Sequence, residues 1–146
     1  MTGDSWLLDT NVLLRWVQHE DPEAPIVEAA LDRLILWGAN LYYTSQNLGE
    51  FWNAMTRPAN RNGYGLSPEE AELRAREVEA GVALLPDNLA VHHEWRRLLV
   101  GYRVCGVQVH DARLVAAMHV HGVKRILTFN TRDFVRFDNI EAVHPA

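Results

Sequence analysis

The sequence has one cysteine, Cys105, and no run of about 18 uncharged apolar residues. A single cysteine excludes an internal disulfide, and without partners at ligand spacing it argues against a structural zinc site. We expect Cys105 to pack in the core. The chain becomes acidic by Asp4 without a basic start or a long apolar stretch. These absences predict a soluble, cytoplasmic protein with no membrane partner.

Positive charge is also scarce, because the formal net charge is -5 and Lys124 is the only lysine. This is the wrong sign for a protein that holds nucleic acid by bulk electrostatic attraction. A polyanionic substrate would therefore need a bound metal ion or a local cluster of arginines, which can grip a phosphate through two parallel hydrogen bonds.

A length of 146 residues with 48% hydrophobic content is typical of one globular domain, which we place at residues 1–146. Helical patterns alternate with short apolar runs that suit buried strands, at residues 6–8, 41–44, 82–85 and 126–129. Strands that alternate with helices predict an α/β fold with a central parallel sheet flanked by helices.

Capping residues mark several helix ends. The stretch "SPEE" has Ser67 at the N-cap, Pro at the first helical position and Glu at the third. Ser45 is a candidate cap for the helix after the second apolar run, and Gly122 suits the left-handed residue that ends a helix. Further helices are expected directly after Asp9, over residues 23–37 and 91–102, and from near residue 110 to Gly122.

Acids follow the predicted strands at several places. In a parallel sheet, ligands bind at the carboxyl ends of the strands. Asp9 directly follows the first apolar run, and Asn130 and Asp133 follow the last one. Glu50 interrupts an apolar stretch of the helix after the second run, and Asp111 lies in the first turn of its helix. Four acids from distant parts of the chain are thus predicted to meet at one edge of the sheet.

Such a group of acids would be costly without a cation. Two like charges about 4 Å apart repel by about 4 kcal/mol at an effective dielectric constant near 20. Oxygen donors without nearby histidine or cysteine ligands suit Mg²⁺ or Mn²⁺. A metal held in this way lowers the pKa of a bound water and stabilises a leaving oxygen, so the pattern predicts phosphodiester hydrolysis.

Each acid also has a purely structural explanation. Asp9 and Asp111 can stabilise the starts of helices through capping and the helix dipole. Glu50 can form a salt bridge with an arginine, and Asp133 can cap a short turn. The joint pattern favours a site more than any single acid does.

Four stretches, taken in order, resemble the PIN-domain ribonucleases, and they are most similar to the VapC-type toxins of bacterial toxin–antitoxin pairs. These stretches are "LLDTNVLLR", "TSQNLGEFWNAMTRP", "GVQVHDARLVAAMHVHGV" and "ILTFNTRDF". The resemblance spans nearly the whole chain. It implies a three-layer PIN fold and metal-dependent endonucleolytic cleavage of RNA, with Mg²⁺ or Mn²⁺ as the cofactor.

The resemblance also implies roles for individual residues. By matching positions, Asp9, Glu50 and Asp111 correspond to the family's first three acids, with Asp9 and Asp111 as direct metal ligands and Glu50 as a further ligand or an orienting group. Asn11 and Thr128 match supporting polar residues of the first and last motifs. We further expect an RNA substrate, an antitoxin partner and a homodimer, with one or two of the five tryptophans at an interface.

The sequence departs from the family at the last acidic position, where Asn130 stands two residues after Thr128. Asparagine can bind a metal or orient a water but brings no charge, which leaves open whether one or two ions bind. Asp133 is a candidate for the missing role. The same departure keeps open an alternative function, a degenerate PIN module that binds RNA or a protein partner without cleavage.

A further enzyme class, the aspartyl phosphatases of α/β fold, also begins with a strand followed by an aspartate. That chemistry needs a second acid two residues later, where this chain has Asn11, and a lysine after a strand, whereas Lys124 precedes one. We therefore favour a ribonuclease, whose predicted catalytic positions are Asp9, Glu50, Asp111, Asn130 and Asp133.

Overall fold

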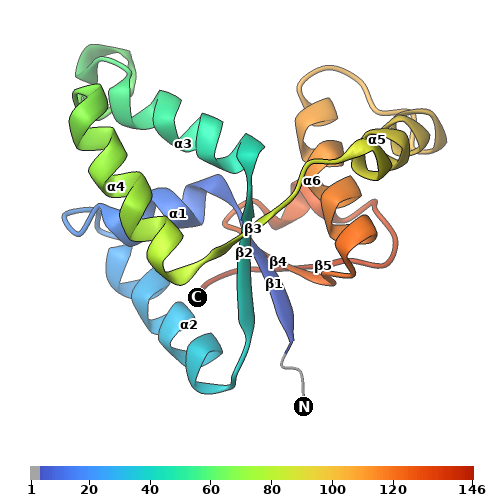
Figure 1. Ribbon diagram of the computed structural model, residues 1–146, viewed down its shortest axis with the longest axis horizontal. Helices are drawn as coiled ribbons and strands as arrows, with labels where there is room; N and C mark the ends of the chain where they lie inside the picture. Colours follow the sequence, from blue (N-terminus) through green and yellow to red (C-terminus); the bar gives the residue numbers. More distant parts are fainter. Residues whose placement is uncertain (1–3) are drawn as a thin grey trace.

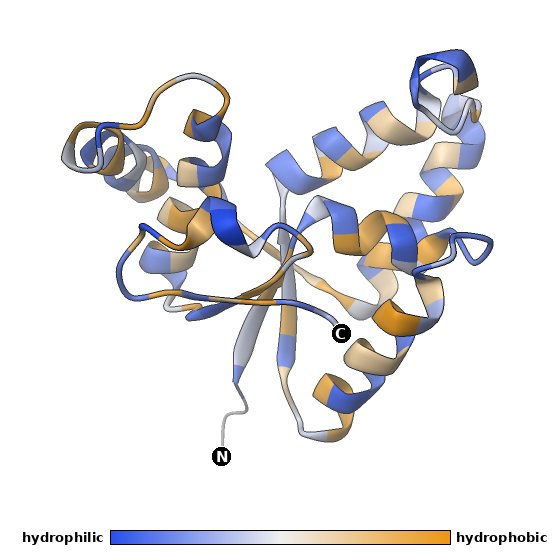
Figure 2. Cartoon of the chain, turned by 180° about the vertical axis from the view of Figure 1, so that it is seen from behind, coloured by the Kyte–Doolittle hydropathy of each residue, from blue (hydrophilic) through white to orange (hydrophobic). Residues whose placement is uncertain are grey.

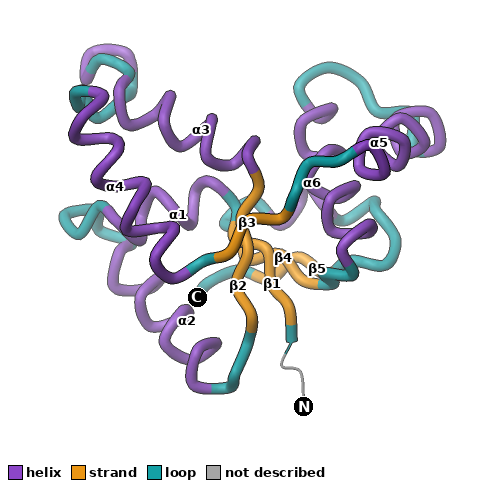
Figure 3. Tube along the Cα trace, viewed as in Figure 1, coloured by secondary structure: helices purple, strands orange, loops and turns teal. Residues whose placement is uncertain are grey.

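The computed structural model describes residues 4–146 and contains a five-stranded, all-parallel sheet (Figure 1). The strands lie in the order β3-β2-β1-β4-β5. Their bounds are β1 Ser5–Leu8, β2 Asn40–Thr44, β3 Ala83–Leu85, β4 Arg125–Leu127 and β5 Glu141–Val143. Helices flank the sheet on both sides, which confirms the predicted α/β fold with a central parallel sheet (Figure 3).

The helices divide into two groups, one on each face of the sheet (Figure 1). One face is covered by α1 Thr10–Val17, α2 Ala24–Leu36, α3 Ser45–Thr56 and α4 Pro68–Gly81. The other face is covered by α5 Leu89–Gly101 and α6 Gln108–His121. Two short 3-10 helices, η1 Ala59–Arg61 and η2 Thr131–Phe134, lie in the connections. None of the helices in this described part of the chain is long and apolar enough to cross a membrane.

The central strand β1 separates two hydrophobic cores. Successive side chains on a strand point to opposite faces of the sheet. Trp6 and Leu8 accordingly belong to the core beneath α1–α4, whereas Leu7 belongs to the core beneath α5 and α6. Along the helices, Figure 2 shows hydrophobic and hydrophilic residues in alternation, as expected for helices that bury one side. Burying one leucine side chain stabilises the fold by about 1.5–3 kcal/mol.

The predicted helix ends are largely confirmed. Ser67 and Glu70 form a capping box at the start of α4, and Gly122 ends α6 with a φ of 70°. The predicted cap at Ser45 is wrong by one residue, because Thr44 is the N-cap of α3 and Ser45 is its first helical residue. Thr44 shares its capping box with Asn47.

Three other features differ from the sequence-based expectation. β4 ends at Leu127, two residues earlier than predicted, so Thr128 begins the connection that follows. The edge strand β5 was not predicted. Cys105 is exposed in the connection between α5 and α6, so the prediction that it packs in the core is wrong. Trp37, at the end of α2, is 69% exposed.

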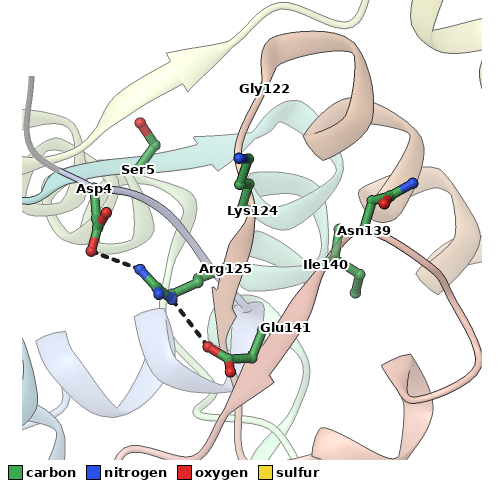
Figure 4. Close-up of a pocket in the computed structure, with 8 residues that line it drawn as sticks. All are labelled: Asp4, Ser5, Gly122, Lys124, Arg125, Asn139, Ile140 and Glu141. Atoms are coloured by element: carbon green, nitrogen blue, oxygen red, sulfur yellow. Dashed lines mark hydrogen bonds and ion pairs between the residues drawn. The ribbon is translucent and has the colours of Figure 1, made fainter.

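A broad hollow of about 760 Å³ lies at the amino ends of β1, β4 and β5 (Figure 4). Within it, Arg125 is held between Asp4, at 2.6 Å, and Glu141, at 3.0 Å. The arginine is therefore already neutralised by carboxylates on both sides. The predicted site acids lie beyond the opposite, carboxyl ends of the strands.

Glu94 joins the two helices of the second face. Its carboxylate accepts hydrogen bonds from Arg97 at 2.7 and 2.8 Å and lies 2.7 Å from Nδ1 of His119 on α6. These contacts, with Arg97 the largest contributor, lower the pKa of Glu94 to about 2 from the usual 4.5. A lowered pKa stabilises the fold above the usual pKa, and this contribution is lost as the pH falls toward 2.

We predict that Glu94→Gln lowers the free energy of unfolding by about 1–2 kcal/mol at pH 7, a value reduced from the full shift because Arg97 is largely exposed. The difference should shrink below about pH 4 and vanish near pH 2. Urea unfolding over this pH range measures it, and Glu77→Gln, which removes an exposed pair with Arg74, is the matched control. A loss of stability that does not change with pH would contradict the prediction.

Candidate functional site

The site lies where the strand order of the sheet reverses. From β1 the chain proceeds outward to β2 and β3, then returns to the other side of β1 for β4 and β5. Ligands of open α/β sheets bind at this reversal, outside the carboxyl ends of the strands. Asp9 directly follows β1 and Thr128 directly follows β4, and the backbone N–H of Asp9 donates to the carbonyl of Leu127 at 3.0 Å. The two side chains therefore start from neighbouring strand ends.

Asp9 is a buried carboxylate, 9% exposed, with both oxygens hydrogen-bonded. Oδ1 accepts from the backbone N–H of Thr10 at 2.8 Å, and Oδ2 accepts from the hydroxyl of Thr128 at 2.7 Å. Burial raises the pKa of Asp9, and Glu50 and Asp133 add to the rise, while the two hydrogen bonds oppose it. Each carboxylate oxygen has a second lone pair, so the bound geometry leaves acceptor capacity for a cation.

The direction of the hydrogen bond from Thr128 to Asp9 is set by its neighbours. The backbone N–H of Phe129 donates to Oδ1 of Asn11 at 3.3 Å, which turns Nδ2 of Asn11 toward the Thr128 hydroxyl at 3.4 Å. The backbone N–H of Asn130 also donates to this hydroxyl, at 3.0 Å. Because both neighbours donate, the hydroxyl hydrogen is left for Asp9. The structure thus brings Asn11 and Thr128 together with Asp9.

Asp111 lies half-buried in the first turn of α6, where the charges of the other acids act on its carboxylate. Burial is the largest cause that raises its pKa to about 7, followed by the charges of Asp133, Asp9 and Glu50. Arg136 acts in the opposite direction. The four predicted acids are therefore close enough to repel one another.

Glu50 is exposed, so the expectation that it interrupts an apolar neighbourhood is wrong. Its Oε1 accepts a hydrogen bond from the hydroxyl of Thr10 at 2.8 Å, rather than pairing with an arginine. The same Thr10 donates its backbone N–H to Asp9. One residue therefore holds two of the site's carboxylates.

In the segment after β4, the acid that lies near the other site acids is Asp133, and Asn130 is uncharged. Asn130 is exposed, and its backbone carbonyl accepts from the N–H of Asp133 at 3.1 Å in the turn that begins η2. This turn places the half-buried Asp133 where its charge raises the pKa of both Asp9 and Asp111.

Sequence reasoning missed three polar residues around the acids. Thr10 could have been identified from the sequence, because it directly follows Asp9. Gln46 donates from Nε2 to the carbonyl of His110 at 2.8 Å and joins the start of α3 to the start of α6. Arg136 contacts the side chain of Gln108, and no sequence motif marks it, because it lies well past β4.

The donor set fits a hard divalent cation. It consists of carboxylate oxygens with excess negative charge, and oxygen-only donors are what Mg²⁺ and Mn²⁺ prefer. Across residues 4–146, no three side chains among histidine, cysteine, aspartate and glutamate are grouped tightly enough to hold an ion alone. Mg²⁺ usually takes one or two carboxylates and keeps several waters. Asp9 and Asp111 provide two carboxylates at this edge of the sheet, and the charge of Asp9 acts on Asp111.

A family model for the PIN domain matches residues 6–140 of this chain. The chain belongs to the PIN domain family. No curated protein matches it at the level of sequence.

Solved structures share this PIN fold over nearly its full length. VapBC2 from Rickettsia felis, bound to a DNA fragment from its promoter, is 12% identical with a TM-score of 0.73 and covers 96% of this chain and 98% of that chain. DNA-bound VapBC from Salmonella typhimurium is 16% identical with a TM-score of 0.69 and covers 98% and 99%. VapC20 from Mycobacterium tuberculosis, a toxin that cleaves the sarcin-ricin loop, is 17% identical with a TM-score of 0.66 and covers 93% and 98%.

We predict that Asp111→Asn stabilises the metal-free PIN domain at alkaline pH. The native pKa of about 7 lies above the usual 3.8, so stability is lost as the pH rises from about 4 to 7. Removing the charge should raise the free energy of unfolding by about 1–2 kcal/mol at pH 8, discounted for partial exposure, and by little near pH 4.

Urea unfolding in the presence of a chelator measures this difference. The exposed Asp32 of α2 provides a matched control, since Asp32→Asn removes a charge outside the site. Equal stability of the Asp111→Asn variant and the wild type at pH 8 would refute the prediction.

Proposed function

We propose that this PIN domain is a cytoplasmic, metal-dependent endoribonuclease and the toxin of a toxin–antitoxin pair. The observation that carries the proposal is the position of Asp9 at the reversal of strand order, hydrogen-bonded to Thr128 and joined through Thr10 to Glu50, with charges of the other acids raising the pKa of Asp111 to about 7. An ion of opposite charge would relieve this repulsion. Hydrolysis of a phosphodiester is the reaction that such an ion and these acids serve together.

In the proposed mechanism, Asp9 and Asp111 would hold Mg²⁺ or Mn²⁺, and the ion would supply activation of a water and stabilisation of negative charge on the phosphate. Thr128 and the Thr10 N–H keep the Asp9 carboxylate in one orientation. Oε1 of Glu50 accepts a hydrogen bond from the Thr10 hydroxyl, and Oε2 would accept a hydrogen bond from the attacking water. In-line attack would leave a 5′-phosphate and a 3′-hydroxyl.

Substrate binding has to overcome the chain's net charge of -5. A phosphate approaching four acids is repelled unless a cation intervenes, so we expect RNA binding at the site to need metal. Arg136 lies close enough to Asp111 to lower its pKa and would meet a phosphate there. To bind two phosphate oxygens at once, its guanidinium would exchange its hydrogen bonds to Gln108 and Tyr102 for the phosphate.

The proposed partners are an antitoxin and a second copy of the chain. Support for an antitoxin comes from the structural neighbours, which include two VapBC complexes and a toxin–antitoxin complex from Klebsiella pneumoniae, each matched over 96% or more of this chain.

The purified protein should cleave labelled RNA when Mg²⁺ or Mn²⁺ is present and stop when a chelator is added. Asp9→Asn and Asp111→Asn should each lower the cleavage rate by about 100-fold or more, since each removes a predicted ligand. Gel analysis of single-stranded and structured RNAs measures the rate. Asp32→Asn, a matched change on the exposed side of α2, should cleave like the wild type. Cleavage that persists in chelator would exclude the metal-dependent mechanism.

Metal binding is testable without any substrate. We predict that millimolar Mg²⁺ raises the Tm of the wild type at pH 8, because an ion that binds only the native state stabilises it. The increase should be lost in Asp9→Asn and kept in Asp32→Asn. Differential scanning fluorimetry measures it, and an equal increase in all three proteins would show that the site does not hold the ion.

The degenerate PIN module is the second candidate, and the uncharged, exposed Asn130 favours it. That module would bind RNA or a protein partner but leave RNA intact at every metal concentration. The reverse substitution separates the two functions: Asn130→Asp should create cleavage in a degenerate module and change the rate of an active nuclease only modestly.

A further inference from the structure

Asn47 is a fully buried polar side chain, 0% exposed, in the first turn of α3. Its Oδ1 accepts from the backbone N–H and the hydroxyl of Thr44, both at 2.9 Å, and so caps the helix. Its Nδ2 donates to the hydroxyl of Thr10 on α1 at 3.2 Å. The cap needs only Oδ1, so the contact with Thr10 has to be explained separately.

The donors and acceptors in this chain of bonds can run in one direction only. A backbone N–H cannot accept, so Thr44 fixes Oδ1 of Asn47 toward itself and Nδ2 toward Thr10. An amide NH₂ cannot accept either, so the Thr10 hydroxyl accepts from Asn47 and keeps its own hydrogen for Oε1 of Glu50, 2.8 Å away. The Thr44 backbone thereby determines how the Glu50 carboxylate is held.

A second chain of hydrogen bonds, with the same kinds of group in the same order, ends on Asp9. There the backbone N–H of Phe129 donates to Asn11, Asn11 to Thr128, and Thr128 to the carboxylate. In both cases a backbone N–H, an asparagine and a threonine end on an acid of the site. This repetition is unexplained by helix capping, because Asn11 caps no helix.

We propose that Asn47 is a positioning residue for Glu50, acting through the Thr10 hydroxyl; the inference rests on the proposed nuclease function of this site. Thr10 also donates its backbone N–H to Asp9. The bonds from Asn47 therefore hold the carboxylate of Glu50 at a fixed place relative to that of Asp9, which is the relation that a water attacking beside the Asp9 ligand requires.

Substitutions that break the bonds without changing side-chain size test the proposal. Asn47→Asp keeps the acceptor toward Thr44 but loses the donor, so the new carboxylate competes with Glu50 for the Thr10 hydrogen. Thr10→Val removes the hydroxyl, and Thr10→Ser keeps it. We expect Asn47→Asp and Thr10→Val to lower kcat by about 10-fold or more with little change in KM, and Thr10→Ser to retain wild-type kcat.

The Glu50→Gln background separates positioning from general damage. If Asn47 acts through Glu50, Asn47→Asp should cause no further loss of kcat in this background. If added charge or misfolding were the cause, the double variant would instead lose kcat by the product of the two single losses. Asn88→Asp is the control for changing an asparagine cap, because the exposed Asn88 caps α5 through the N–H of Val91 and is not hydrogen-bonded to Thr10 or Glu50, so this change should leave kcat unchanged.

A second readout does not depend on cleavage. NMR relaxation of the Glu50 side-chain methylenes should show an ordered carboxylate arm in the wild type and Thr10→Ser, and increased mobility in Thr10→Val and Asn47→Asp. If RNA is not cleaved but this pattern appears, the positioning role stands and the nuclease function fails. Unchanged Glu50 mobility in Asn47→Asp, or losses of kcat that multiply in the Glu50→Gln background, would overturn the positioning role.

Discussion

The hydrogen bond from the Thr128 hydroxyl to the Asp9 carboxylate is the contact on which the rest of the site depends. It joins the ends of β1 and β4, the two strands between which the strand order reverses. A carboxylate that is 9% exposed needs such a donor, because an unpaired buried acid costs several kcal/mol. The same hydroxyl accepts from the N–H of Asn130, so this contact also sets where the segment carrying Asp133 begins.

The two ends of the sheet treat charge in opposite ways. At the amino ends, Arg125 lies between two carboxylates and is neutralised (Figure 4). At the carboxyl ends, the charges of Asp133, Asp9 and Glu50 raise the pKa of Asp111. Arg136 is the cation that acts in the opposite direction and lowers it. Hydrophobic cores pack against both faces of β1, the strand that ends at these acids. Perturbed pKa values such as that of Asp111 cluster at functional sites, which is why this edge of the sheet is the candidate site.

Most of the fold and part of the site could be predicted from local sequence. Apolar runs located four strands, and the cap at Ser67 depends only on adjacent residues. The edge strand β5 was missed because three residues that begin with an exposed glutamate carry no hydrophobic pattern. The predicted environment of Glu50 was wrong because the direction of a helical side chain depends on how α3 packs against α1. Asn47 was missed for the same reason, since its partner Thr10 is 37 residues away in the sequence.

Asn130 is easier to understand once the charges of the site are considered together. Asp133, one turn further along, already raises the pKa of Asp9 and Asp111. An acid at position 130 would add a fifth carboxylate to a group in which Asp111 titrates near pH 7, and its repulsion would have to be offset by a second cation. An amide keeps an oxygen ligand at that place without the charge. Under the proposed function, an amide at this position suits a site that would hold one divalent ion, and Asp133 is the acid that adds charge near the end of β4.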